Sequence, residues 1–188
     1  MQYFNICSFG LLAARLIFTY MGRNIYFLLA VVMLAPLFCF SQECIIQRET
    51  DPYTKEIKLS TGFIQLKNAT LSIQADKKEI DFFFIISGED KCFTDAASAS
   101  VFFEGSKVKI SIRNTGSMNC DGFFHFVFKN QALVPSSLQR LASQKVTRIL
   151  FTGNEKKETQ ITLTADQQFL WMHSASCLLE EARKLLPG

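Results

Sequence analysis

Two histidines and four cysteines are the side chains that could carry acid–base or thiol chemistry beyond the apolar N-terminal region of this chain. His125 follows Cys120 by five residues, so the two could form a thiol–imidazole pair if the thiol is free. His173 precedes Cys177 by four residues. Because imidazole is the usual acid–base group near neutral pH, one hypothesis is a small hydrolase or thiol enzyme that uses Cys120 or His125.

A packing role competes with the chemical role of each histidine. His125 shares one face of a strand pattern with Phe123 and Val127, where a histidine is ordinarily packed. His173 borders the apolar stripe of the last predicted helix. The chain has no H-E-x-x-H motif, no G-x-S-x-G motif, no P-loop and no glycine-rich dinucleotide turn. The sequence therefore assigns no catalytic residue, no cofactor and no metal site.

Two other polar motifs can also be explained without a functional site. Glu89, Asp90 and Asp95 lie in one predicted loop and offer oxygen ligands for calcium, but their spacing does not match an EF-hand loop. We therefore expect a solvated loop there. Asn68 begins a glycosylation sequon, which has meaning only in a eukaryotic secretory pathway.

The N-terminal region has the layout of a secretion signal. Its first 41 residues contain two charges, Arg15 and Arg23, and the apolar run 25–40 follows the second of them. This run is shorter than the roughly 20 residues that a membrane span needs. We therefore predict a signal peptide over residues 1–41 and a single exported domain over residues 42–188.

The exact start and fate of the signal stay open. Cleavage before Gln42 would leave small side chains at both positions that signal peptidase reads. Met21 could be the true start, in which case residues 1–20 are an upstream extension. Residues 1–40 could instead be retained as a membrane anchor. Lipidation of Cys39 is disfavoured because a bulky residue precedes it.

Four cysteines remain in the predicted exported domain. An even number in an exported chain suggests up to two disulfides, with three connectivities open. Cys92 and Cys120 lie in polar loops that flank one predicted hairpin, which favours their pairing. Cys44 and Cys177 would then link the N-terminal strand to the last helix, unless they stay as buried thiols. The wide spacing excludes C-x-x-C redox chemistry and zinc-ribbon sites.

The predicted exported domain is nearly neutral. Without Arg15 and Arg23 it has 18 basic and 17 acidic residues, a net charge of +1. This balance argues against nucleic acid or anionic lipid as the main partner, so membrane contact is expected only through an uncleaved N-terminal segment. Lys107, Lys109 and Arg113 lie at alternate positions along one predicted strand, which is typical of the solvent-exposed face of a sheet.

Alternating apolar and polar side chains predict mostly strands after residue 42. The segment 80–87 is apolar on both faces from Phe82 to Ile86 and is predicted to be a central strand. Two hairpins are predicted, one around a two-residue type II′ turn at Gly105-Ser106 and one around Gly153-Asn154. The predicted strands cover residues 57–66, 71–75, 80–87, 101–103, 108–112, 122–129, 145–152 and 158–162.

Two helices are predicted from capping boxes and apolar spacing. Ser136 and Gln139 form a capping box at the start of a short helix, and Thr164 and Gln167 form a second one at residues 164–186. The apolar stripe of the second helix is Phe169, Met172, Ala175, Leu179, Ala182 and Leu186. We therefore predict an α+β fold, mainly an antiparallel β-sheet with a short helix and a C-terminal amphipathic helix packed on the sheet.

Three segments resemble small uncharacterised exported proteins of Bacteroidetes-type bacteria: Phe40-Ser41-Gln42, the turn Asp51-Pro52-Tyr53-Thr54-Lys55-Glu56, and Leu138 to Ile149. Those proteins share an opening Asp-x-Tyr/Phe-Thr-Gly turn, a β-rich middle and a late helix–strand–helix end. Lys55 stands where they usually have glycine. The resemblance covers most of the predicted domain and implies a periplasmic or cell-surface location. It implies no activity, so no functional residue carries over.

We therefore expect an exported, non-enzymatic binding or envelope-structural module, located in the periplasm, on the cell surface or outside the cell. Its loops at 87–99 and 114–121 would face an unknown protein or envelope component, and no nucleic acid. One alternative is a small periplasmic hydrolase or thiol enzyme that uses Cys120 or His125. The other is a membrane-tethered protein with residues 1–40 retained.

Overall fold

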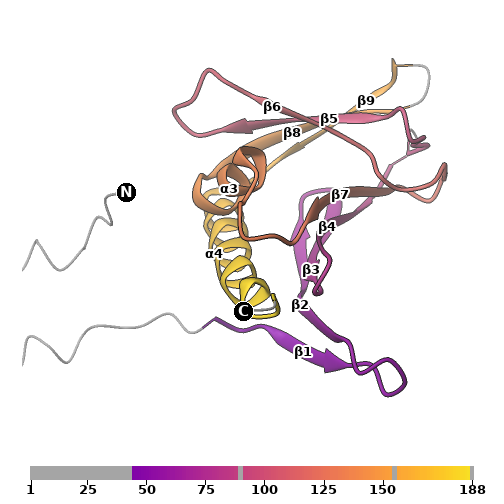
Figure 1. Cartoon of the computed structure of the whole chain (residues 1–188). Coiled ribbons are helices and arrows are strands. Elements are labelled where there is room, and N and C mark those ends of the chain that lie inside the picture. Colours follow the sequence, from indigo (N-terminus) through magenta and orange to yellow (C-terminus); the bar gives the residue numbers. More distant parts are fainter. Residues whose placement is uncertain (1–43, 89–90, 154–155, 187–188) are drawn as a thin grey trace, which may run out of the picture. The chain divides into compact units, whose positions relative to one another are not determined.

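The computed structural model describes residues 44–88, 91–153 and 156–186, which form nine strands in two antiparallel sheets together with two helices (Figure 1). The fold is α+β and mainly β, as the sequence predicts. The predicted signal peptide over residues 1–41, its cleavage at Gln42 and the alternative anchor over residues 1–40 lie outside the described residues.

The first sheet has five strands in the order β1-β2-β3-β4-β7. Their bounds are β1 Gln47–Thr50, β2 Ile57–Leu66, β3 Ala69–Ala75, β4 Glu79–Ile86 and β7 Phe123–Lys129. The predicted central strand is confirmed, because β4 pairs with β3 on one side and β7 on the other. Along β4, fully buried and partly exposed side chains alternate, so one side of this sheet faces the core.

The turn between β1 and β2 is formed by short-range hydrogen bonds from the predicted Asp51–Glu56 segment. Oδ1 of Asp51 accepts hydrogen bonds from the backbone N–H groups of Tyr53 and Thr54, each at 2.8 Å. These two donors hold the pKa of Asp51 below its usual value, and the N–H group of Thr54 has the larger effect. Lys55 then takes a left-handed conformation with φ 58°, which glycine adopts at no steric cost.

The second sheet has four strands in the order β6-β5-β8-β9. Their bounds are β6 Ile110–Arg113, β5 Ser98–Phe103, β8 Val146–Thr152 and β9 Glu158–Thr162. Both predicted hairpins are present. The prediction of a two-residue turn at Gly105-Ser106 is wrong, because β6 begins only at Ile110 and the connection is therefore longer. Arg140 donates to the backbone oxygen of Val108, which is therefore held by a helix rather than by the sheet ladder.

The two helices are α3, Ser136–Ser143, and α4, Ala165–Arg183. The capping box of α4 is confirmed, since Thr164 and Gln167 bond each other reciprocally. The predicted capping box of α3 is wrong: Pro135 occupies the N-cap position and no side chain caps the helix. Pro135 has no N–H and suits the entry to a helix through its fixed φ, so α3 begins without a side-chain cap.

The buried stripe of α4 differs from the predicted one. Trp171 and Leu178 are fully buried, whereas Phe169, which the sequence placed in the stripe, is 44% exposed. The core-facing row runs through Trp171, Ala175, Leu178 and Ala182, which also has helical spacing. α4 has apolar residues on more than one of its faces, so helical spacing alone could not identify the row that contacts β2, β3 and α3.

One aromatic-rich core joins the two sheets and α4. The ring of Phe84 on β4 packs against Phe126 of β7, Phe151 of β8 and Trp171 of α4, with ring centroids 4.8–5.7 Å apart. In Figure 1, α4 runs alongside α3, and it contacts strands of both sheets. Aromatic rings bury large areas, so these contacts are a main source of the stability of the fold.

Candidate functional site

The structure contains two disulfides, and they join the pairs expected from the sequence. Cys44 is bonded to Cys177 and Cys92 to Cys120. Because its sulfur is bonded to Cys92, Cys120 is no free nucleophile in this structure. Two disulfides indicate an oxidising, extracytoplasmic compartment. None of the helices among the described residues has the length and apolar character needed to cross a membrane.

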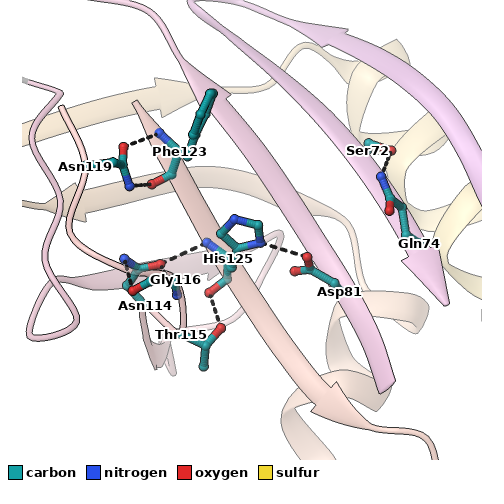
Figure 2. A network of polar contacts seen from close by, with 9 residues as sticks. All are labelled: Ser72, Gln74, Asp81, Asn114, Thr115, Gly116, Asn119, Phe123 and His125. Carbon is teal, nitrogen blue, oxygen red and sulfur yellow. Dashed lines mark hydrogen bonds and ion pairs between the residues drawn. The ribbon is translucent and has the colours of Figure 1, made fainter. Parts of the chain in front are cut away.

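His125 forms a close polar contact that the sequence did not reveal. Its Nδ1 lies 2.7 Å from Oδ2 of Asp81, and both side chains are partly buried (Figure 2). Asp81 lies on β4, where it is paired in register with Val127, the second residue after His125 on β7. The contact therefore crosses the sheet diagonally. It was missed because Asp81 and His125 are 44 residues apart in the chain.

This contact determines how the imidazole is oriented. A carboxylate only accepts hydrogen bonds, so Nδ1 of His125 donates to Asp81, while Nε2 accepts in the neutral ring and donates in the protonated one. The ring also stacks on Phe83, with centroids 4.7 Å apart and planes at 25°. Among the described residues Nε2 has no hydrogen-bond partner. The result is an oriented imidazole that can bind an external donor or accept a proton.

Loop 114–121 holds the backbone of His125 in place. Oδ1 of Asn114, a residue that is 2% exposed, accepts from the backbone N–H of His125 at 3.0 Å. The backbone N–H and the hydroxyl of Thr115 both donate to the carbonyl oxygen of His125 (Figure 2). Gly116 faces the ring, because an added Cβ would lie 2.8 Å from Cδ2 of His125. These contacts use the Asn-Thr-Gly turn that separates two predicted strands.

The same loop covers the free edge of β7 beside Phe123. Oδ1 of Asn119 accepts from the backbone N–H of Phe123 at 2.9 Å, and its Nδ2 donates to the Phe123 carbonyl oxygen at 3.0 Å (Figure 2). Asn119 also pairs with Phe93 through two backbone hydrogen bonds. The adjacent Cys92–Cys120 disulfide joins the same two segments. The edge of β7 is therefore blocked against pairing with another strand.

One oxygen of Asp81 lacks a partner. Oδ1 is buried and has no hydrogen bond to any of the described residues. A buried polar atom of this kind costs free energy unless water or a ligand satisfies it. Asp81 also lines a shallow pocket of about 120 Å³, which has room for water. The other lining residues are Lys58, Gln74, Ala75, Asp76 and Glu79.

The sheet surface around this pair is unusually aromatic. We call the side of β2, β3, β4 and β7 that points away from the core the outer face. Its central residues are Phe63, Ser72, Asp81, Phe83, Phe123 and His125. Phe63 is 67% exposed and Phe123 is 37% exposed. The outer face thus combines exposed rings with one oriented polar pair.

The other predicted polar motifs do not form a site in the described part of the chain. Glu89 and Asp90, two of the three calcium candidates, lie outside the described residues, and Asp95 is 3.7 Å from Arg113 in an ion pair. Lys109 lies over the ring of Phe102 at 5.7 Å. The basic row is thus engaged with its own sheet rather than arranged around a common point.

The second histidine lies against the other disulfide. Nε2 of His173 is 3.7 Å from Sγ of Cys177, and its ring is parallel to that of Phe169 at 6.0 Å. Cys44 completes the group, since the ligand atoms of the three residues lie within 4.8 Å of one another. We call Cys44, His173 and Cys177 the Cys–His cluster.

The chain was also compared with protein-family models, with curated proteins and with solved structures. None of the three comparisons finds a match. The chemistry of the outer face therefore has to be interpreted from the contacts of its own residues, with the Asp81–His125 pair at its centre.

Proposed function

We propose that this chain is an exported, non-enzymatic binding module whose outer face contacts a protein or another envelope component. The observation that carries the proposal is the exposure of Phe63 and Phe123 on the same sheet surface as the Asp81–His125 pair. Aromatic rings beside a few oriented polar groups are typical of binding surfaces. Export is supported by the two disulfides and by the signal-like pattern of residues 1–41.

The opposite sheet supplies the contrast that supports this choice. The side of β5, β6, β8 and β9 that points away from the core is mostly polar, with Ser98, Ser100, Ser111, Thr152, Gln160 and Thr162 among its residues. Phe102 and Leu150 on this side are half-buried, and the guanidinium of Arg148 lies 3.9 Å from the centre of the Phe102 ring. A sheet surface that meets only water normally has this polar composition. Exposed phenylalanines on the outer face have no such explanation and are suited to a partner.

The polar pair would give this surface its specificity. The Asp81 carboxylate holds the imidazole of His125, so Nε2 can accept a hydrogen bond from a partner without reorienting. Oδ1 of Asp81 is itself buried, so Nε2 of His125 is the acceptor that this pair presents to a partner. An oriented acceptor among aromatic rings favours a partner that offers both an apolar patch and a donor.

The resemblance to exported proteins of Bacteroidetes-type bacteria is part of this proposal. It is supported by Lys55, whose left-handed φ of 58° matches the position where those proteins usually have glycine. A periplasmic or cell-surface location follows from the resemblance. Intact mass measurement of the protein from its native host would test it, with Gln42 or Glu43 expected as the first residue. Retention of residues 1–40 would instead identify a tethered protein.

Photo-crosslinking in the native host tests the binding surface directly. A benzophenone amino acid would replace Phe63 in one variant and Phe123 in a second. The matched control replaces Gln160, which is exposed on the opposite sheet. We expect the two outer-face positions to give the same crosslinked partner and the control to give none. Equal crosslinking from all three positions, or none from any, would overturn the proposal.

Acid–base catalysis by His125 is the second candidate. It is favoured by the 2.7 Å contact with Asp81, which is the arrangement of a histidine base and its orienting carboxylate. Hydrolysis of model esters by the purified protein, abolished by His125→Ala but retained by Phe63→Ser, would support an enzyme. Absence of hydrolysis together with loss of crosslinking in Phe63→Ser would support the binding module.

A further inference from the structure

The Cys–His cluster contains the types of side chain that bind soft metal ions, but its two cysteines are oxidised to a disulfide in this structure. Thiolate sulfur and imidazole nitrogen are the preferred ligands of zinc, whereas a disulfide sulfur is a poor one. We propose that reduction of the Cys44–Cys177 disulfide by a dithiol reductant converts the Cys–His cluster into a zinc site. The disulfide and the metal would then be alternative links between the N-terminal segment and α4.

The geometry of α4 already places two of the ligands. His173 and Cys177 are four residues apart on one helix, so their side chains lie on the same face one turn apart. Nε2 of His173 lies 3.7 Å from Sγ of Cys177. In a tetrahedral site with Zn–S near 2.3 Å and Zn–N near 2.0 Å, sulfur and nitrogen are about 3.5 Å apart. These two ligands therefore need almost no rearrangement.

Cys44 is the ligand that has to move. Its sulfur is bonded to that of Cys177, whereas two thiolates on one tetrahedral zinc are about 3.8 Å apart. Once the bond is reduced, a rotation of the exposed Cys44 side chain can separate the two sulfurs. The chain around Cys44 stays in place without the disulfide because β1 pairs with β2 and because Arg48 lies 3.6 Å from Glu181 on α4.

The proposed conversion is balanced in electrons and protons. A thiolate of the reductant attacks the sulfur of Cys44, which is exposed, and Cys177, which is 5% exposed, leaves as the thiolate. The second thiol of the reductant then attacks the mixed disulfide, so the reductant is oxidised to its disulfide and the protein gains two electrons and two protons. Zinc binding displaces the two thiol protons, and water occupies the fourth position.

The other disulfide supplies an internal control. Among the described residues, the Cys–His cluster is the group of cysteine, histidine and acidic side chains whose ligand atoms come close enough for a common ion. Cys92 and Cys120 are not part of such a group, although reduction would give them the same two thiols. A metal site that depends on His173 therefore distinguishes the proposal from zinc binding by any pair of cysteines.

The test is zinc and cobalt binding by the mature protein purified from its native host, reduced with a phosphine that adds no thiol. We compare the parent with three variants: Cys92→Ala/Cys120→Ala, the same pair plus His173→Ala, and Cys44→Ala/Cys177→Ala. The reduced parent and Cys92→Ala/Cys120→Ala should bind one zinc, and with cobalt show a thiolate-to-cobalt absorption band. Adding His173→Ala removes a direct ligand, so it should weaken zinc binding by more than the roughly 10–100-fold that loss of an outer-shell partner costs.

Several outcomes would overturn the proposal. These are absence of zinc uptake by the reduced parent, an undiminished affinity after His173→Ala, and equal cobalt spectra for the parent and Cys44→Ala/Cys177→Ala. Binding by the oxidised parent as tight as by the reduced one would also overturn it. If Cys92→Ala/Cys120→Ala fails to fold by circular dichroism, His173→Ala is made in the parent, and its cobalt spectrum against that of Cys44→Ala/Cys177→Ala decides the same question.

Discussion

The two histidines lie in regions assembled from the same kinds of parts. Each imidazole faces a phenylalanine ring, Phe83 for His125 and Phe169 for His173. Each region also contains one of the two disulfides. The polar partners differ: a carboxylate 2.7 Å from His125, but a disulfide sulfur 3.7 Å from His173. The same side chain is therefore tightly oriented in one region and loosely held in the other.

The difference comes from the elements on which the histidines lie. On the outer face, His125 has neighbours on the adjacent strand and a loop that bonds its own backbone, so Asp81 and Asn114 reach it from two directions. On α4, His173 has close neighbours mainly one turn away on its own helix. A strand beside a covering loop thus prepares a histidine for directed contacts, whereas a half-buried helix position leaves one available as a ligand.

The largest expected effect comes from cutting the disulfide of each region. The loop closed by Cys44–Cys177 spans 133 residues and that closed by Cys92–Cys120 spans 28. Loop-closure entropy then gives losses of about 5 and about 3.6 kcal/mol in the free energy of unfolding. Urea denaturation of the two double alanine variants under oxidising conditions measures both. A larger loss for Cys92→Ala/Cys120→Ala would show that contacts of loop 114–121 outweigh loop length.

Replacing each histidine compares the two regions at the level of one side chain. His125→Ala leaves the partly buried Asp81 without this partner, so we expect a loss of about 1.5 kcal/mol in unfolding free energy. His173→Ala removes a weaker sulfur contact and should cost roughly 0.5 kcal/mol. Equal losses would mean that the carboxylate contact contributes little. Asp81→Asn serves as a control, because it keeps the shape of the side chain but removes its charge. Nitrogen NMR spectra should then show that the imidazole of His125 is held less firmly than in the parent.

A smaller effect is expected at the turn that leads from β1 into β2. Lys55 has φ 58°, so Lys55→Gly should raise the unfolding free energy by about 0.5–1 kcal/mol. Lys77→Gly is the matched control, because Lys77 is also an exposed turn lysine but has no positive φ, and it should be destabilising. A destabilised Lys55→Gly protein in thermal unfolding would contradict the role of the left-handed backbone.

The smallest effect is the pH dependence of the ion pairs around Glu181. A hydrogen bond from Lys184 and the charges of Lys184 and Arg48 hold the pKa of Glu181 below its usual value. A carboxyl with a lowered folded-state pKa stabilises the protein above its unfolded-state pKa, about 4.3, and loses this contribution as the pH falls through the folded-state value. Glu181→Gln should therefore differ from the parent in urea midpoint at neutral pH and converge with it in acid.

Glu180→Gln is the control for this comparison, because Glu180 is exposed on the same helix and belongs to neither ion pair. A difference between parent and Glu181→Gln that persists unchanged in acid would show that packing rather than charge is responsible. Convergence for Glu181→Gln alone would show that Arg48 and Glu181 help to hold the N-terminal segment beside α4.

Local patterns in the sequence predicted most elements of this fold. Side-chain alternation located the strands, and the Thr164–Gln167 capping box located the start of α4, because both depend on residues a few positions apart. The two cysteine pairs followed from an even count and from the hairpin that Cys92 and Cys120 flank. The turn at Gly105 was misjudged because Arg140, distant in sequence, holds the connection open.

The division into two sheets and the contents of the outer face depended on tertiary structure. Asp81 meets His125 only because β4 pairs with β7 in one particular register, and a shift of β7 by one residue would send His125 toward the core while Asp81 stayed on the outer face. The Cys–His cluster likewise needs Cys44 to return to α4 across 133 residues. The sequence by itself determined which segments become strands and helices. Contacts between distant segments decided which polar side chains meet, because pairing energies there depend on the packing of the whole core.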